Sequence, residues 1–306
     1  MRWGADCGSD HELVKAPMTS GRKVDYIASR KISIPVNKEN VIKYGILDAK
    51  YESQIPDEII FTISKDKDYI TKPELFMLDL LSNYEWDRPL HLLNMGGDIN
   101  IGIKEYLTYE GFSFKFIPIK NKTTSTEPGF VDPEELYRKM TQVYKFDAVS
   151  ADNYFIDYQN QYTYLGLLSL RGMFVNCSNV FMREGQNDRA LEMLDRGLEV
   201  MQHYPLEAVP LGFSGQNFMV VNMVENYYKL DQKTKARELA LDLSLELLVS
   251  AKFYIEFYDW APEEFELVGN YIYFLADVME KAGDGDLAKE VTDTFVQMIE
   301  IASEKS

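Results

Sequence analysis

Three helix–turn–helix units can be recognised in the second half of the chain, and they leave little freedom for its fold. In each unit a bulky residue near the end of the first helix precedes, by nine positions, an alanine near the start of the second. The pairs are Phe181 and Ala190, Tyr227 and Ala236, and Met279 and Ala288. A small residue at this position lets the two helices of a hairpin approach closely. We therefore expect an all-α region built of helical hairpins.

The expected helices are separated by short polar turns, and they span residues 165–183 and 189–203, 218–230 and 234–249, and 265–282 and 287–302. The pattern is similar to the tetratricopeptide repeat in degenerate form. The three alanines are 46 and 52 positions apart, whereas the standard repeat is about 34 residues long. Longer helices or inserted loops account for the difference.

The first half of the chain alternates strand-like and helix-like segments. Short apolar runs predict strands near residues 31–36, 58–63, 90–94 and 112–119. Pro73 and the apolar spacing behind it predict a helix over residues 74–84, and a second helix is expected over residues 101–109, ended by Gly111. This order favours a small, mostly parallel sheet with flanking helices, an α/β domain.

These patterns divide the chain into four expected parts. They are a flexible N-terminal segment (residues 1–22), the α/β domain (23–130), a connecting helix and linker (131–163), and tetratricopeptide-like helical hairpins (164–306).

Charge is distributed unevenly between these parts. The chain has 32 basic and 49 acidic residues, a net charge of −17, and residues 151–306 alone contain 12 basic and 26 acidic residues. A negative field of this size repels phosphate backbones and anionic headgroups, so we expect no binding to nucleic acid and none to a lipid surface. A partner of basic or neutral polar character is favoured.

The residues that usually bind metals are scattered. Cys7 and Cys177 cannot form a ligand set, and His11, His91 and His203 lie in three unrelated segments. We expect no metal and no cofactor. His91 is interpreted as a hydrogen-bonded residue of a buried strand rather than a general base.

One loop of the first half has the composition of a ligand-binding turn. Asn94, Gly96, Gly97 and Asp98 lie between an expected strand and an expected helix, where α/β proteins hold phosphates. The spacing matches neither the dinucleotide motif nor the P-loop, and Asp98 would repel an anion. A tight turn is therefore the favoured interpretation, with a ligand loop as the alternative.

An aromatic strip in the second half gives a second candidate site. Tyr254, Phe257, Tyr258 and Trp260 could line a groove for a sugar or a peptide by stacking. Burial between helices is the favoured alternative, because aromatic side chains are preferentially buried.

Several segments resemble, in order and over nearly the whole chain, the C-terminal region of a bacterial membrane-protein family. They are residues 24–45, 86–91, 102–111, 116–119, 131–137 and 185–195. The family is domain of unknown function 2723, which is similar to protein O-mannosyltransferases. The chain departs from the family pattern at residues 92–97, where members more often have a small or hydroxyl residue before a Gly-Ser or Gly-Asp turn.

The resemblance implies a multi-pass membrane region of the lipid-sugar-dependent glycosyltransferase type, followed by an extracytoplasmic α/β portion and tetratricopeptide-like helices. The catalytic acidic residue of such enzymes lies in the membrane region, to which nothing here corresponds, so no catalytic residue is carried over. We expect a truncated product or the soluble half alone, connected to a membrane only through the missing N-terminal region. As part of the parent protein, it would lie on the extracytoplasmic face of a bacterial inner membrane.

Two functions from different classes follow. The first is a non-catalytic accessory module of a membrane glycosyltransferase-like protein, with a helical-repeat groove that binds a polypeptide partner or acceptor protein. The alternative is a free-standing α/β enzyme or small-ligand binder with its site at the Gly96-Gly97 loop. A purely structural scaffold would differ from the first in lacking a groove with exposed aromatic residues.

Overall fold

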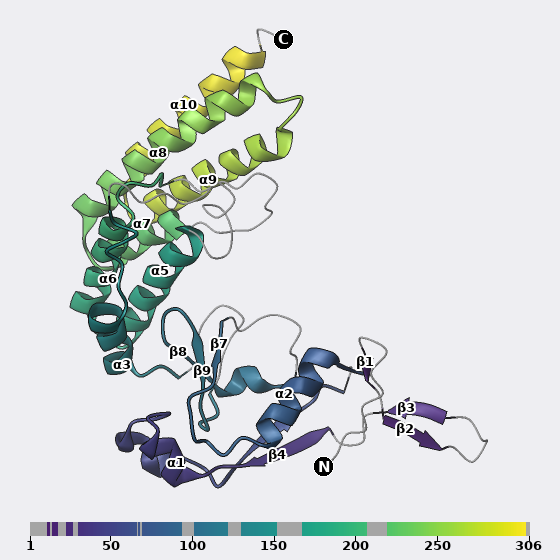
Figure 1. The fold of residues 1–306 in the computed structure, drawn as a ribbon. Helices are drawn as coiled ribbons and strands as arrows, with labels where there is room; N and C mark the ends of the chain where they lie inside the picture. Colours follow the sequence, from purple (N-terminus) through teal and green to yellow (C-terminus); the bar gives the residue numbers. More distant parts are fainter. Residues whose placement is uncertain are drawn as a thin grey trace. The chain divides into compact units, whose positions relative to one another are not determined.

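The computed structural model describes residues 11–12, 14–17, 23–26, 30–65, 67, 69–93, 101–121, 130–151, 167–206 and 219–303. The chain forms two compact units, residues 1–136 and residues 137–306. The first is a mixed domain of short strands and helices, and the second is helical (Figure 1).

The strands described in the first unit pair only in antiparallel fashion. The two-stranded pairs are β1 (His11–Glu12) with β6 (Ile70–Thr71), β2 (Val14–Pro17) with β3 (Lys23–Tyr26), and β4 (Lys31–Pro35) with β5 (Glu58–Thr62). A three-stranded sheet has the order β7 (His91–Leu92), β9 (Phe114–Phe116), β8 (Leu107–Tyr109). The prediction of a mostly parallel sheet is therefore wrong for these strands.

The reason is the helix that was expected over residues 101–109. This segment instead forms a 3₁₀ turn, η2 (Ile103–Tyr106), followed directly by β8. Gly111 has a φ of 93° and lies in the hairpin between β8 and β9, where the Glu110 N–H donates to the Ser113 carbonyl at 3.0 Å. A tight turn joins antiparallel strands, whereas a parallel pair needs a long crossover connection.

The helical elements of the first unit are α1 (Lys38–Lys43), the 3₁₀ helix η1 (Ala49–Gln54) and α2 (Lys72–Ser82), with α3 (Pro133–Arg138) and the π turn η3 (Lys139–Val143) at the unit boundary. The core of the unit is centred on Trp86, which is fully buried. Its ring stacks on Phe116 at 5.2 Å, and its Nε1–H donates to the Pro35 carbonyl at 2.9 Å. The indole thus ties the β7–β9–β8 sheet to β4.

The second unit contains six long helices in its described part. They are α5 (Leu167–Arg183), α6 (Asn187–Val200), α7 (Met219–Lys229), α8 (Lys233–Glu256), α9 (Pro262–Lys281) and α10 (Gly285–Ser303). Consecutive helices pack as the hairpins α5–α6, α7–α8 and α9–α10. The helix α8 extends beyond its expected end at residue 249. In the described ranges, no helix combines the length and the apolar character that crossing a membrane requires.

The three hairpin turns share one geometry. Each has a residue with left-handed backbone, and the N–H of the next residue donates to the carbonyl of the bulky residue that defines the sequence pattern, as in a Schellman motif. These donations are Gln186 to Phe181 (2.8 Å), Gln232 to Tyr227 (2.8 Å) and Asp284 to Met279 (2.9 Å). Ala190, Ala236 and Ala288 are buried. The nine-residue spacing therefore marks a repeated turn.

Candidate functional site

A hollow of about 590 Å³ lies along α6 of the helical unit. Its lining residues come from α6, from the residues just after α6, and from the segment that precedes α5: Phe146, Asp147, Ser150, Asp188, Leu191, Glu192, Asp195, Arg196, Glu199, Val200 and Gln202. We call this hollow the α6 groove. Its size is that of ordinary ligand pockets in proteins.

The local sequence of α6 places its carboxylates in one row. Asp188, Glu192, Asp195 and Glu199 follow one another at spacings of three or four, so they share a helix face. Ala190, Met193, Leu194 and Gly197 are buried on the other face. At a rise of 1.5 Å per residue, the row is about 16 Å long.

The groove is strongly acidic. Five of its lining side chains are carboxylates, and Arg196 is its cationic one. The Arg196 guanidinium lies over the Phe146 ring at 5.6 Å, and Phe146 is itself buried against Phe174. The groove therefore has one rigid aromatic wall and a negative lining.

Two of the five carboxylates are held by tyrosines. The Tyr137 hydroxyl donates to Glu192 at 2.7 Å, and this hydrogen bond raises the pKa of Tyr137. Asp195 accepts from the Tyr227 hydroxyl at 2.9 Å and pairs with Lys235 at 2.8 Å. In the described part of the chain, Asp147, Asp188 and Glu199 have no ion-pair partner. These three can therefore bind cationic groups of a ligand without breaking an internal pair.

The predicted aromatic strip lies elsewhere, at the end of α8 and in the turn before α9. Tyr254 is partly buried against the helical core. Phe257, Tyr258 and Trp260 are exposed, Trp260 to 89%. Burial between helices, the favoured interpretation from the sequence, does not describe these three residues; of them, Tyr258 contacts the Phe265 ring of α9 edge-on at 5.6 Å.

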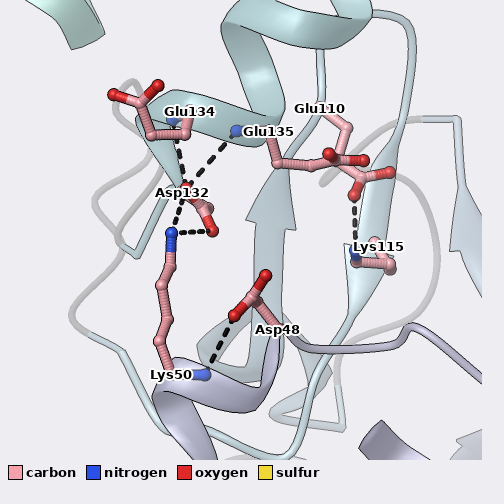
Figure 2. Close-up of polar contacts among 7 residues, drawn as sticks. All are labelled: Asp48, Lys50, Glu110, Lys115, Asp132, Glu134 and Glu135. Atoms are coloured by element: carbon pink, nitrogen blue, oxygen red, sulfur yellow. Dashed lines mark hydrogen bonds and ion pairs between the residues drawn. The ribbon is translucent and has the colours of Figure 1, made fainter. Parts of the chain in front are cut away.

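The four residues of the predicted ligand loop, Asn94, Gly96, Gly97 and Asp98, lie outside the described residues. His91, on the strand before that loop, has Nδ1 at 3.2 Å from the Ser113 hydroxyl and 3.6 Å from the Glu110 carboxylate. Glu110, just after the end of β8, forms a buried ion pair at 2.6 Å with Lys115 of β9 (Figure 2). These contacts fix one face of the three-stranded sheet.

A second polar cluster of the first unit joins η1 to the start of α3 (Figure 2). Asp132 accepts hydrogen bonds from the backbone N–H groups of Glu134 and Glu135, at 3.1 and 3.4 Å. It also pairs with the Lys50 ammonium at 2.8 Å, and this hydrogen-bonded contact raises the pKa of Lys50. Asp132 therefore caps α3, and its role is structural.

Metal chemistry has no visible site in the part of the chain that the structure describes. No group of three or more His, Cys, Asp or Glu side chains is placed there to hold a metal ion.

Sequence reasoning missed the acidic row of α6. Charged residues on a surface helix usually form a solvated face, so carboxylates alone do not indicate a groove. The available signal was their spacing from residue 188 to 199, together with the aromatic Phe146 before the first hairpin. Only the fold brings that ring to the α6 face.

The chain therefore combines a mixed α/β domain with helical hairpins that carry an acidic groove. Residues 4–135 match the family model described as TMEM260-associated domain 2, a domain linked to a membrane protein family. The match covers the first unit and leaves the helical hairpins outside it. Neither the curated proteins nor the solved structures gave a match.

Proposed function

We propose that this chain is a non-catalytic binding module whose helical unit holds a basic polypeptide segment in the α6 groove. The observation that supports this most is the lining, with five carboxylates and one guanidinium around an aromatic wall. Hydrogen bonds between ammonium or guanidinium groups and carboxylates are about twice as strong as neutral ones. Leu191, which is partly exposed, offers apolar surface for the long stems of lysine and arginine, beside the buried Phe146 and Val200.

The spacing of the carboxylates favours an extended segment. Neighbouring members of the row are about 4.5–6 Å apart along the helix axis. Alternate side chains of an extended peptide are about 7 Å apart and point to the same side. A segment with basic residues at alternate positions would therefore place successive cations near successive carboxylates.

The module would serve a membrane glycosyltransferase-like protein of the family catalogued as domain of unknown function 2723, on the extracytoplasmic side of the membrane. Two observations support this part of the proposal. The family match of the first unit is to a domain linked to a membrane protein family, and the three helical hairpins share one recurring turn geometry. The types of residue that line the α6 groove favour the binding of a partner or an acceptor over catalysis.

The test is a titration of the full chain with a short labelled peptide of alternating lysine and serine, followed by fluorescence anisotropy. A peptide of alternating glutamate and serine serves as the negative probe. The double variant Asp188→Asn/Glu199→Gln removes one carboxylate from the first turn of α6 and one from the last. We expect it to weaken binding about thirtyfold, because two charge-assisted contacts of roughly 1 kcal/mol each are lost.

The matched control is Glu263→Gln/Glu280→Gln, which removes one exposed carboxylate from the first turn of α9 and one from its last turn. It should leave the affinity unchanged. Equal losses in the two double variants would mean that the peptide senses only the total charge, and the groove assignment would then be wrong.

A further inference from the structure

Exposed apolar side chains form a continuous row along α8. Leu241, Leu245, Val249, Phe253 and Phe257 follow one another at intervals of four residues, and each is between 46% and 65% exposed. Residues at this spacing form a ridge on the helix surface. We call this row the α8 ridge; the exposed Trp260 follows it in the next turn.

The α8 ridge lies outside the buried face by which α8 packs against the other helices of its unit. This buried face packs against α7, α9 and α10 through Ala236, Leu239, Ala240, Leu243, Leu247 and Ala251 (Figure 1). A helix that only covers a core is apolar on one side and polar on the other. Since α8 is apolar on both sides, the ridge is a second packing surface.

The area of the ridge is appropriate for a protein contact. Large side chains that are half exposed each present on the order of 100 Å², which gives the ridge with Trp260 roughly 600–800 Å². A stable interface uses about 800 Å² on each partner. Exposed apolar patches of this size mark interaction sites.

The length of the ridge indicates the shape of its occupant. From Leu241 to Phe257 it extends about 24 Å along the axis. A helix that crosses at about 50° contacts a neighbour over roughly 13 Å, whereas one that crosses at about 20° does so over nearly 30 Å. A row at four-residue spacing turns by about 40° around the helix axis at each step, so a straight helix contacts consecutive members of the ridge rather than all of it. A nearly aligned helix keeps the longer contact, and such a helix has apolar residues at alternating spacings of three and four.

The charges beside the ridge distinguish between the possible helices. Glu238, Asp242 and Glu256 are exposed and Glu246 is partly so, whereas Lys252 is the basic residue among them. Two copies of α8 packed antiparallel about Val249 would place Asp242 opposite Glu256 but also Glu246 opposite Lys252, so a second copy gains no net charge complementarity. A partner with basic flanks is attracted by the same groups.

We propose that the α8 ridge docks an amphipathic helix of another polypeptide, whose apolar face is flanked by lysine or arginine. This surface is distinct from the α6 groove, which is polar and suits an extended segment.

The experiment titrates the full chain with three labelled helical peptides of about 18 residues. The first has leucines at heptad spacing with lysine flanks, the second has the same leucines with glutamate flanks, and the third has the composition of the first in shuffled order. We expect the first to bind at least tenfold more tightly than the other two. The variant Leu245→Gln/Phe253→Gln should weaken its binding at least tenfold and keep the helical circular dichroism of the wild type.

The matched control is Leu93→Gln/Phe76→Gln, which removes one exposed leucine and one exposed phenylalanine from the first unit; it should bind as the wild type does. The groove variant Asp188→Asn/Glu199→Gln should also bind the helical peptide normally, so failure of one proposal is distinguishable from failure of the other.

Three outcomes would overturn the ridge proposal. They are equal binding of the ordered and shuffled lysine peptides, unchanged binding by the ridge variant, and light scattering that shows a dimer in the wild type and a monomer in the ridge variant. The last would assign the ridge to a second copy of the chain.

Discussion

Asp284 is buried at the turn between α9 and α10, and three side chains of the neighbouring hairpin bind it. The Tyr228 hydroxyl donates to it at 2.7 Å, and Lys233 and Arg237 pair with it at 2.9 and 2.6 Å. Burial alone would raise the pKa of Asp284, but these hydrogen bonds and charges outweigh it and hold the pKa below its ordinary value. The carboxylate therefore stabilises the fold in its ionised form.

Replacing this carboxylate should make the free energy of unfolding less dependent on pH in the acidic range. Because the folded-state pKa is lowered, the stabilisation is present above the ordinary value of 3.8 and is lost as pH falls through the folded-state pKa. We expect Asp284→Asn to reduce the free energy of unfolding by about 2 kcal/mol at neutral pH, since the buried group loses charge-assisted hydrogen bonds to Tyr228 and to two half-exposed cations. Urea unfolding of both proteins should show this gap narrowing below about pH 4. A gap that stays constant with pH would contradict the role of the charge.

Gly197 gives a residue-scale test of packing between α5 and α6. A Cβ added there would lie 2.9 Å from the Phe174 Cβ, so a backbone shift would be needed. We expect Gly197→Ala to destabilise the protein by about 1–3 kcal/mol despite the better helix propensity of alanine. Gly285→Ala is the control, because nothing lies within 4 Å of a Cβ at that position. Thermal unfolding should show no loss for the control; a stable Gly197→Ala protein would mean that the two helices separate easily.

At the scale of elements, the recurring hairpin turn depends on one left-handed residue. Glycine occupies it in two turns, Gly185 (φ 73°) and Gly283 (φ 82°), and Asp231 (φ 58°) in the third. Left-handed backbone costs most residues roughly 1–2 kcal/mol and costs glycine almost nothing.

We expect Asp231→Gly to increase the free energy of unfolding by up to about 1 kcal/mol, and Gly283→Ala to decrease it by about 1 kcal/mol. The surroundings of Gly283 are open, so the second effect reports the backbone alone. Chemical denaturation of the two variants measures both. Effects of the same sign would show that the turns differ in more than their φ angle.

The turns also show what the sequence could specify. The distance from a bulky residue to an alanine is set within one hairpin, so it could be recognised locally. All six helices overlap the predicted segments, although α8 continues to Glu256 and α6 ends at Val200. Residues 101–109 could not be assigned in this way. Their apolar spacing suits a helix, but Leu107 and Tyr109 pair with Phe116 and Phe114. The segment forms a strand because β9 pairs with it, and the apolar spacing within residues 101–109 does not show that partner.

The candidate groove was equally inaccessible to local reasoning. A row of carboxylates on a helix looks the same whether it faces solvent or a hollow. The difference depends on Phe146, which precedes α5 in the chain and is brought beside Arg196 only by folding. The exposure of the aromatic strip was also inaccessible, because a general preference for burial does not say which side chains of α8 and of the following turn the neighbouring helices cover.

At the scale of the whole molecule, the net charge of −17 affects stability. Most of it belongs to residues 151–306, so like charges repel one another across the helical unit. We expect the melting temperature to rise as sodium chloride is added up to about physiological strength, because screening weakens this repulsion between exposed groups. Differential scanning calorimetry measures the trend. A falling melting temperature would mean that surface ion pairs outweigh the general repulsion.

The turn between α7 and α8 connects the hairpins on both sides of it. Tyr227 and Lys235 bind Asp195 of α6, while Tyr228, Lys233 and Arg237 bind Asp284 of the third hairpin. Because five polar contacts converge on one edge of the middle hairpin, mechanical stiffness is concentrated there. Thermal motion of one hairpin against the next should then be mainly rotation about this edge, with amplitude growing toward the far ends of the helices. The end of α8 that bears Phe253 and Phe257 is such an end, so its position can adjust to an arriving partner while the turn side stays fixed.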